Sequence, residues 1–144
     1  AAHGCDHTIV YTREDIVARV KEITGGAMLP VVYDSVGQAT FMKSIDCLRP
    51  RGLMVAYGQA SGIVPPFSVN ILSAKGSLYL TRPTLQTYTA KREELVERAD
   101  ALFAAIASGT VKCQVQRRFP LRDAAAAHRA LGERNTTGSS VLMP

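Results

Sequence analysis

The chain has 144 residues, of which 47% are apolar and 20% are charged, and its formal net charge is +5. This composition fits one globular domain of ordinary size and excludes a disordered, collagen-like or coiled-coil protein. No stretch approaches the roughly 18 uncharged apolar residues that a membrane span needs, so we expect no membrane partner. The chain begins Ala-Ala-His-Gly-Cys-Asp, without Met or a signal peptide, and we expect it to be a piece of a longer protein.

The basic charge is concentrated in the second part of the sequence. Residues 81–144 hold 10 Lys and Arg against 6 Asp and Glu, which contributes +4 of the net +5. Such a bias suits an anionic partner, such as a phosphate-bearing cofactor or, more weakly, a nucleic acid. It is also typical of a solvated basic surface, which charge alone favours.

The three cysteines, Cys5, Cys47 and Cys113, stand apart from one another in the sequence. Their odd number and the absence of a Cys-x-x-Cys pair argue against a disulfide framework and favour a reducing, cytoplasmic compartment. His3 and His7 flank Cys5, but no fourth ligand follows, so we predict no metal site. On its helix, Cys47 is predicted to be a small core residue.

Short β-branched runs alternate with segments of helical period along the chain. We predict strands over residues 7–11, 30–33, 52–58, 77–81 and 139–143, and an extended segment over 111–121. We predict helices over residues 16–23, 41–48, 93–108 and 122–134. Thr12 and Asp15 are expected to form a capping box before the first helix. This alternation predicts an α/β protein with a mainly parallel sheet. Ligands bind beyond the carboxyl ends of the strands in such sheets, which points here to Tyr11 and to residues 34–37 and 57–62.

Five sequence blocks, in this order, carry a family resemblance: residues 20–26 (VKEITGG), 31–37 (VVYDSVG), 48–55 (LRPRGLMV), 75–84 (KGSLYLTRPT) and 136–142 (TTGSSVL). They resemble the C-terminal half of the NADPH-dependent quinone oxidoreductases, the zeta-crystallin-like, zinc-free branch of the medium-chain dehydrogenase/reductase superfamily. The resemblance implies that residues 1–110 form a partial nucleotide-binding (Rossmann) domain without its first two strands and its glycine-rich turn. Residues 111–144 would return to the GroES-like catalytic domain.

The resemblance also implies an activity. The whole enzyme would transfer hydride from NADPH to a quinone or a related conjugated carbonyl without a metal, and this piece alone would be inactive. It would form a homodimer through the strand between Ser77 and Thr81. The alternative is a non-catalytic binding or assembly module on a nucleotide-binding fold, RNA binding included; no RNA-recognition motif is present, so we do not expect a nucleic-acid partner.

Missing strands would leave an open edge on the sheet. In the strand order 3-2-1-4-5-6, the strand around Val31 is the fourth, and the absent first strand would lie beside it. An exposed apolar edge pairs with whatever is available, so we predict either strand rearrangement or association with a second chain there.

Four of the cofactor contacts implied by the resemblance each have an alternative explanation. Tyr11 would stack near the adenosine end of the cofactor, or would only cap a strand end. Ser35 and Gly37 would meet the ribose on the nicotinamide side, or would form a turn that starts a helix. Arg134 would hold a phosphate, or would be a surface arginine at a helix C-terminus.

The remaining implied contacts follow two further strands. Backbone and amide groups after the strand at 52–58 would bond to the cofactor, and backbone groups at the end of the strand at 77–81 would meet the nicotinamide carboxamide. The residues are Tyr57, Gly58, Gln59 and Ala60 after the first of these strands, and Leu80, Thr81 and Arg82 at the second. No catalytic side chain is predicted within the chain.

Overall fold

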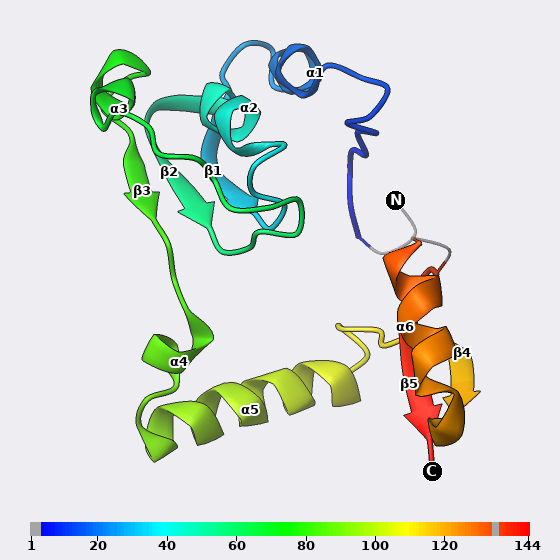
Figure 1. Ribbon diagram of the computed structural model, residues 1–144. Coiled ribbons are helices and arrows are strands. Elements are labelled where there is room, and N and C mark those ends of the chain that lie inside the picture. Colours follow the sequence, from blue (N-terminus) through cyan, green and yellow to red (C-terminus); the bar gives the residue numbers. More distant parts are fainter. Residues whose placement is uncertain (1–3, 134–135) are drawn as a thin grey trace. The chain divides into compact units, whose positions relative to one another are not determined.

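The computed structural model describes residues 4–133 and 136–144 (Figure 1). The chain divides into two compact units, Ala1–Lys91 and Arg92–Pro144, which are described separately. The family resemblance instead implies a domain boundary between residues 110 and 111, after which the chain would return to the catalytic domain. That boundary stays a prediction.

A three-stranded parallel sheet forms the centre of the first unit. Its strands are β1 (Leu29–Asp34), β2 (Leu48–Ala56) and β3 (Tyr79–Thr81), in the order β1-β2-β3. Val32 of β1 is paired with Met54 of β2, and Met54 with Leu80 of β3. The predicted α/β class with parallel strands is confirmed. Within the described residues β1 pairs with β2 alone, so its other edge is open as expected.

Four helices accompany this sheet: α1 (Ile16–Ile23), α2 (Phe41–Asp46), α3 (Asn70–Ala74) and α4 (Leu85–Tyr88). Asp15 is the N-cap of α1, because its carboxylate accepts hydrogen bonds from the Val17 and Ala18 N–H groups. The predicted capping box with Thr12 is therefore wrong. α2 contacts β1 and β2, and α1 packs on α2.

The core lies between α2 and one face of the sheet. Strand side chains alternate between faces, so Met54 and Ala56 point toward α2 while Leu53 and Val55 point away. The buried cluster consists of Phe41, Ile45, Leu48, Met54, Ala56 and Leu78. Cys47 is also buried, as predicted.

The second unit contains a βαβ arrangement and a long helix. Strands β4 (Val115–Pro120) and β5 (Ser139–Met143) pair in parallel, and α6 (Ala124–Gly132) contacts both. A 3-10 turn, Leu121–Asp123, precedes α6, and α5 (Arg92–Ala107) is the long helix. No helix in the described part of the chain is long and apolar enough to cross a membrane.

The predicted strand at residues 7–11 does not form. A strand needs a hydrogen-bonded neighbour, and the described residues offer none to this segment. Instead, the Arg13 and Glu14 N–H groups donate to the Val10 carbonyl, and the Glu14 carboxylate accepts from the Val10 N–H at 2.6 Å. Tyr11 therefore lies in a turn that leads into α1.

Other predicted boundaries also shift. The helix expected to include Leu48 ends at Asp46, because Leu48 pairs with Leu29 as the first residue of β2. Helices α3 and α4 were not predicted, since segments of four or five residues are too short to show a helical period.

Candidate functional site

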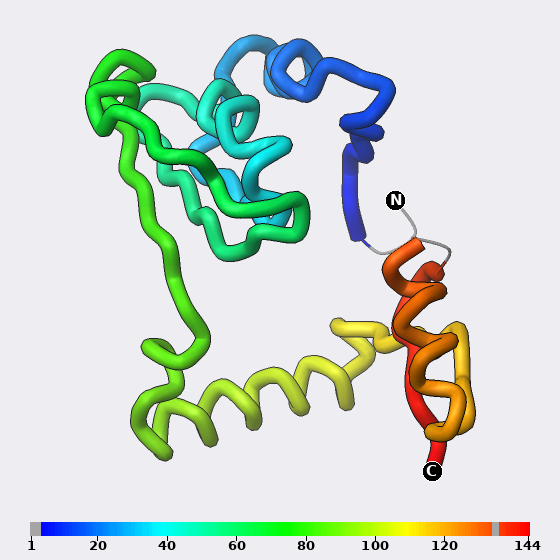
Figure 2. The backbone as a smooth tube through the Cα atoms, viewed as in Figure 1, coloured from blue at the N-terminus to red at the C-terminus, as the bar shows by residue number. Residues whose placement is uncertain are grey.

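The carboxyl ends of β1, β2 and β3 lie at one edge of the first unit's sheet, because the three strands are parallel (Figure 1). Two loops begin there: residues 35–40 after β1 and residues 57–67 after β2. The second loop runs out past the strand ends and then crosses back over the sheet toward α3 (Figure 2). Strand-end residues that are far apart in the sequence thus come together.

Asp34 anchors the first loop. Its Oδ1 accepts hydrogen bonds from the Val36 N–H at 2.8 Å and the Gly37 N–H at 2.9 Å. Its Oδ2 accepts from the Thr40 hydroxyl at 2.8 Å and the Ser44 hydroxyl at 2.7 Å. Burial raises the pKa of this carboxyl, but the four hydrogen bonds together outweigh burial and hold the pKa below its ordinary value of 3.8.

Hydrogen bonds also join the two loops to each other, and we call this set the strand-end clasp. The Tyr57 and Gly58 N–H groups donate to the Asp34 carbonyl at 2.9 and 3.2 Å. The Ser61 hydroxyl donates to the Val36 carbonyl at 2.7 Å and accepts from the Ala39 N–H at 2.9 Å. The clasp holds one loop against the other.

Two glycines permit this close approach. A Cβ on Gly58 would lie 2.6 Å from the Cα of Ser35, and a Cβ on Gly37 would lie 2.7 Å from the Gly62 carbonyl oxygen. Gly37 also has a φ of +88°, which side-chain-bearing residues rarely adopt. Both positions therefore require glycine for the loops to meet.

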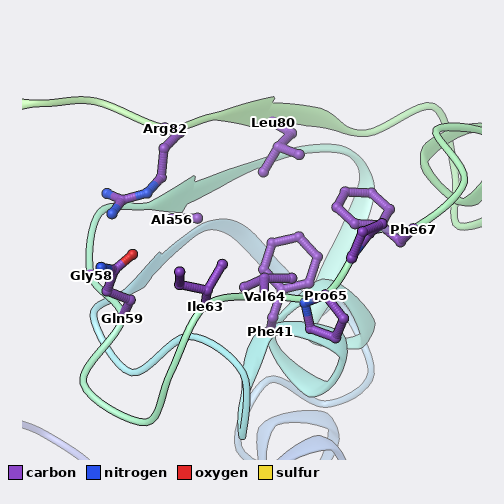
Figure 3. Close-up of a pocket in the computed structure, with 11 residues that line it drawn as sticks. Phe41, Ala56, Gly58, Gln59, Ile63, Val64, Pro65, Phe67, Leu80 and Arg82 are labelled. Atoms are coloured by element: carbon purple, nitrogen blue, oxygen red, sulfur yellow. The ribbon is translucent and has the colours of Figure 1, made fainter.

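A cavity of about 470 Å³ opens beside the clasp. Its walls come from α2, the ends of β2 and β3 and the 57–67 loop (Figure 3). The lining residues are Phe41, Ala56, Gly58, Gln59, Ile63, Val64, Pro65, Pro66, Phe67, Leu80 and Arg82.

The cavity has an aromatic end and a polar end. Phe41 and Phe67 form the aromatic end, with ring centroids 5.1 Å apart. Figure 3 shows the Arg82 guanidinium and the Gln59 amide at the opposite end. The side chains of Gln59 and Ser35 form no hydrogen bond with another described residue, so both are available to a ligand.

The predicted cofactor residues divide between two faces of the sheet. Gly58, Gln59, Leu80 and Arg82 line the cavity on the α2 face. Tyr57 and Thr81 line a second cavity of about 560 Å³ on the other face, together with Tyr33, Leu85 and Tyr88. The strand alternation that the sequence predicts causes this division.

One predicted contact is not brought to this edge of the sheet. Tyr11 lies in the turn before α1 and lines neither of these cavities. Arg134 lies outside the described residues. Ser35, Gly37 and Ala60 lie in the two loops, where the Ala60 N–H donates to the Ser35 carbonyl at 3.3 Å.

Sequence reasoning missed the apolar wall and the role of Asp34. The wall comes largely from the loop segment Ile-Val-Pro-Pro-Phe at residues 63–67, where Ile63 is 75% exposed. Such a run in a Gly- and Pro-rich loop is a signal for an apolar binding surface. The signal for Asp34 is a carboxylate that precedes two loop N–H groups, as in an Asx turn.

Comparison with known proteins places the chain in a family. The family model described as zinc-binding dehydrogenase matches residues 3–142. Quinone oxidoreductase 1 of Escherichia coli is 52% identical over 143 residues, which cover 98% of this chain and 44% of that protein. A 2-haloacrylate reductase from Burkholderia is 50% identical over 142 residues, with 98% and 43% covered. The crystal structure of Escherichia coli quinone oxidoreductase complexed with NADPH has a TM-score of 0.89 and 54% identity, over 94% of this chain and 42% of that chain.

The chain belongs to the zinc-binding dehydrogenase family, whose model matches nearly all of it. Its parallel α/β sheet is of the kind found in nucleotide-binding domains. Within the family, its resemblance to the quinone oxidoreductases is confirmed. The chain spans less than half of the length of the first curated relatives it matches.

The family's description names zinc, but the described residues do not fit a zinc site. No group of three or more His, Cys, Asp or Glu side chains gathers among them in a way that would hold a metal ion. Structural and catalytic zinc sites need three or four such ligands. We therefore derive no step through zinc.

Proposed function

We propose that this chain is part of an enzyme that transfers hydride from NADPH to a quinone or a related conjugated carbonyl. The observation that supports this most directly is the edge where three parallel strands end beside a cavity lined by the Gln59 amide and the Arg82 guanidinium. Parallel α/β sheets bind nucleotides at such an edge. Several of the relatives that match are named quinone oxidoreductases, and the Escherichia coli quinone oxidoreductase was crystallised with NADPH.

The loop groups have the chemistry to bind a dinucleotide. The exposed Ser35 hydroxyl can bond to a ribose hydroxyl, and the Gln59 amide can donate to or accept from the cofactor. Leu80, Thr81 and Arg82 offer backbone groups at the end of β3, where we place the nicotinamide carboxamide. NADPH supplies the hydride when bound, and these residues orient it.

The cavity supplies an apolar surface for the acceptor. Its wall around Val64, Pro65 and Phe67 is apolar, which suits an aromatic or conjugated ring. Arg82 adds a positive charge at the polar end, where charge develops on a reduced oxygen.

A homodimer through β3 is part of the proposal. Within the described residues β3, which is shorter than the predicted strand at 77–81, pairs only with β2, so one of its edges is open. Tyr79 is 64% exposed beside that edge. Replacing Tyr79 with lysine places like charges near a twofold axis, so size-exclusion chromatography with light scattering is expected to show a monomer. A variant that stays dimeric contradicts this interface.

Cytoplasmic localisation stays a prediction. Cys5, Cys47 and Cys113 are all free thiols, which supports a reducing compartment.

The central test compares the 144-residue chain with the full-length protein that contains it. NADPH binding is measured by nucleotide fluorescence, and turnover by absorbance with a benzoquinone or naphthoquinone acceptor. We expect the full-length protein to bind NADPH with micromolar affinity and to reduce the quinone. The chain alone is expected to bind weakly and to turn over nothing, since it spans 44% of its relative.

Two results would refute the proposal. One is a full-length protein that binds no NADPH. The other is a salt-dependent shift of labelled RNA at physiological ionic strength without quinone reduction, which would favour the RNA-binding alternative.

A further inference from the structure

We propose that Asp34 and Ser61 are positioning residues, which hold the two strand-end loops in the geometry that binds the cofactor before the cofactor arrives. The inference rests on the proposed function, because it concerns the same site. Neither side chain needs to touch the ligand. Asp34 is 4% exposed, and Ser61 is half-buried between the loops.

Asp34 fixes the first loop by accepting hydrogen bonds from four donors. Its Oδ1 holds the Val36 and Gly37 N–H groups, which places the Ser35 hydroxyl beside the strand end. Its Oδ2 holds two hydroxyls of the following segment, so the loop is tied to α2 as well. A fully satisfied buried carboxylate is rigid, because moving it would leave several donors unpaired.

The same carboxylate also decides which part of a dinucleotide can bind here. Free backbone N–H groups in the turn between a strand and a helix are common partners of a phosphate. At β1 the Val36 and Gly37 N–H groups already donate to Asp34, and its negative charge repels a second anion. This strand end therefore favours the uncharged ribose that the family resemblance implies beside Ser35 and Gly37 over a phosphate.

Ser61 links the second loop to the first. Its hydroxyl donates to the Val36 carbonyl and accepts from the Ala39 N–H, while its own N–H donates to the Val36 carbonyl at 2.8 Å. The backbone bonds from Tyr57 and Gly58 to Asp34 complete the clasp. Gln59 is thereby held between two fixed points, opposite Arg82.

The test uses the full-length protein with three variants. Asp34→Ala removes the four-donor acceptor, and Ser61→Ala removes the hydroxyl bridge. Ser68→Ala is a matched control, because it also removes a hydroxyl that accepts a backbone hydrogen bond, from the Asn70 N–H at 3.3 Å, but lies outside the clasp. Circular dichroism confirms folding, fluorescence gives the Kd for NADPH, and kcat is measured at saturating NADPH and quinone. Preorganised loops lower the cost of binding, so loosening them weakens affinity more than turnover.

We expect Ser61→Ala to raise the Kd for NADPH about 10-fold, Asp34→Ala to raise it about 10- to 100-fold, and both to keep kcat within about threefold. Ser68→Ala is expected to match the wild type. A merely structural role would instead lower the folded fraction and kcat and leave Kd unchanged.

A folded Ser61→Ala variant with an unchanged Kd overturns the inference alone, and this variant decides the matter if Asp34→Ala fails to fold. A wild type that binds no NADPH overturns the proposed function together with the inference. The two failures are thus distinguishable.

Discussion

At the scale of single residues, Asp34 shows how a buried carboxylate can stabilise a loop. Its pKa is lower in the folded chain than its ordinary value of 3.8, so the folded state binds this proton less readily than the unfolded state. The stabilisation is therefore present above pH 3.8 and is lost as pH falls through the folded pKa. Chemical unfolding of Asp34→Asn and wild type at several pH values tests this. We expect the stability difference to be larger at about pH 7 than at about pH 3; an equal difference at both would contradict the assignment.

Met54 is the most buried side chain of the sheet, at 0% exposed, and packs in the cluster with Phe41 and Ile45. Met54→Ala removes three heavy atoms from this core and is expected to lower the free energy of unfolding by about 2–5 kcal/mol. Met42, one residue into α2, is 43% exposed and supplies the control. Met42→Ala is expected to lower the free energy of unfolding, measured in urea, by under about 1 kcal/mol. Equal losses of unfolding free energy in the two variants would contradict the burial of Met54.

Cys47 illustrates a residue whose environment the sequence predicted well. A cysteine on an apolar helix face was expected in the core, and the structure buries it. Burial, followed by the negative charges of Asp46 and Asp15, raises the pKa of this thiol to about 11. It is therefore a packing residue and a poor nucleophile near neutral pH.

At the scale of elements, the two strand-end loops can meet only because Gly58 has no side chain. Gly58→Ala would press its Cβ against the backbone of Ser35, so we expect a loss of about 2–4 kcal/mol in unfolding free energy and weaker NADPH binding. Gly132→Ala is the matched control, since nothing lies within 4 Å of its Cβ position at the end of α6. That variant is expected to be neutral or to stabilise by up to about 1 kcal/mol. Equal stability of both variants would show that the loops do not meet as described.

The elements differ in how far sequence could predict them. The sequence predicts the strand at 139–143 and the helix from 93 almost to the residue, because a short apolar run and a long helical period are local signals. The segment at 7–11 has the same local signal and forms no strand, because pairing depends on a neighbour. At the candidate site, the sequence predicts a role for Gln59 and Arg82, which line one cavity in the structure. It predicts no role for Phe67 or Asp34.

At the scale of the whole molecule, the sheet of the first unit is incomplete as a nucleotide-binding fold. One face is covered by α2 and contains the core, whereas the other exposes Tyr33 at 72% and Tyr79 at 64%. Doubly wound sheets are covered on both faces. This exposure agrees with a chain that spans less than half of its curated relatives, and it is the reason for expecting activity only from the full-length protein.

The sequence by itself determined the α/β class, the parallel strands around Val32 and Met54, and the family. The period of apolar residues and the order of short sequence blocks depend only on residues that are close together in the sequence, so they can be recognised without the structure. Only the tertiary structure decided that Asp34 and Ser61 clasp the two loops, and that Tyr57 and Gln59 face different cavities. Hydrogen bonds between residues 25 positions apart, and burial against a distant strand, depend on where the chain folds back on itself. No local pattern encodes that distance.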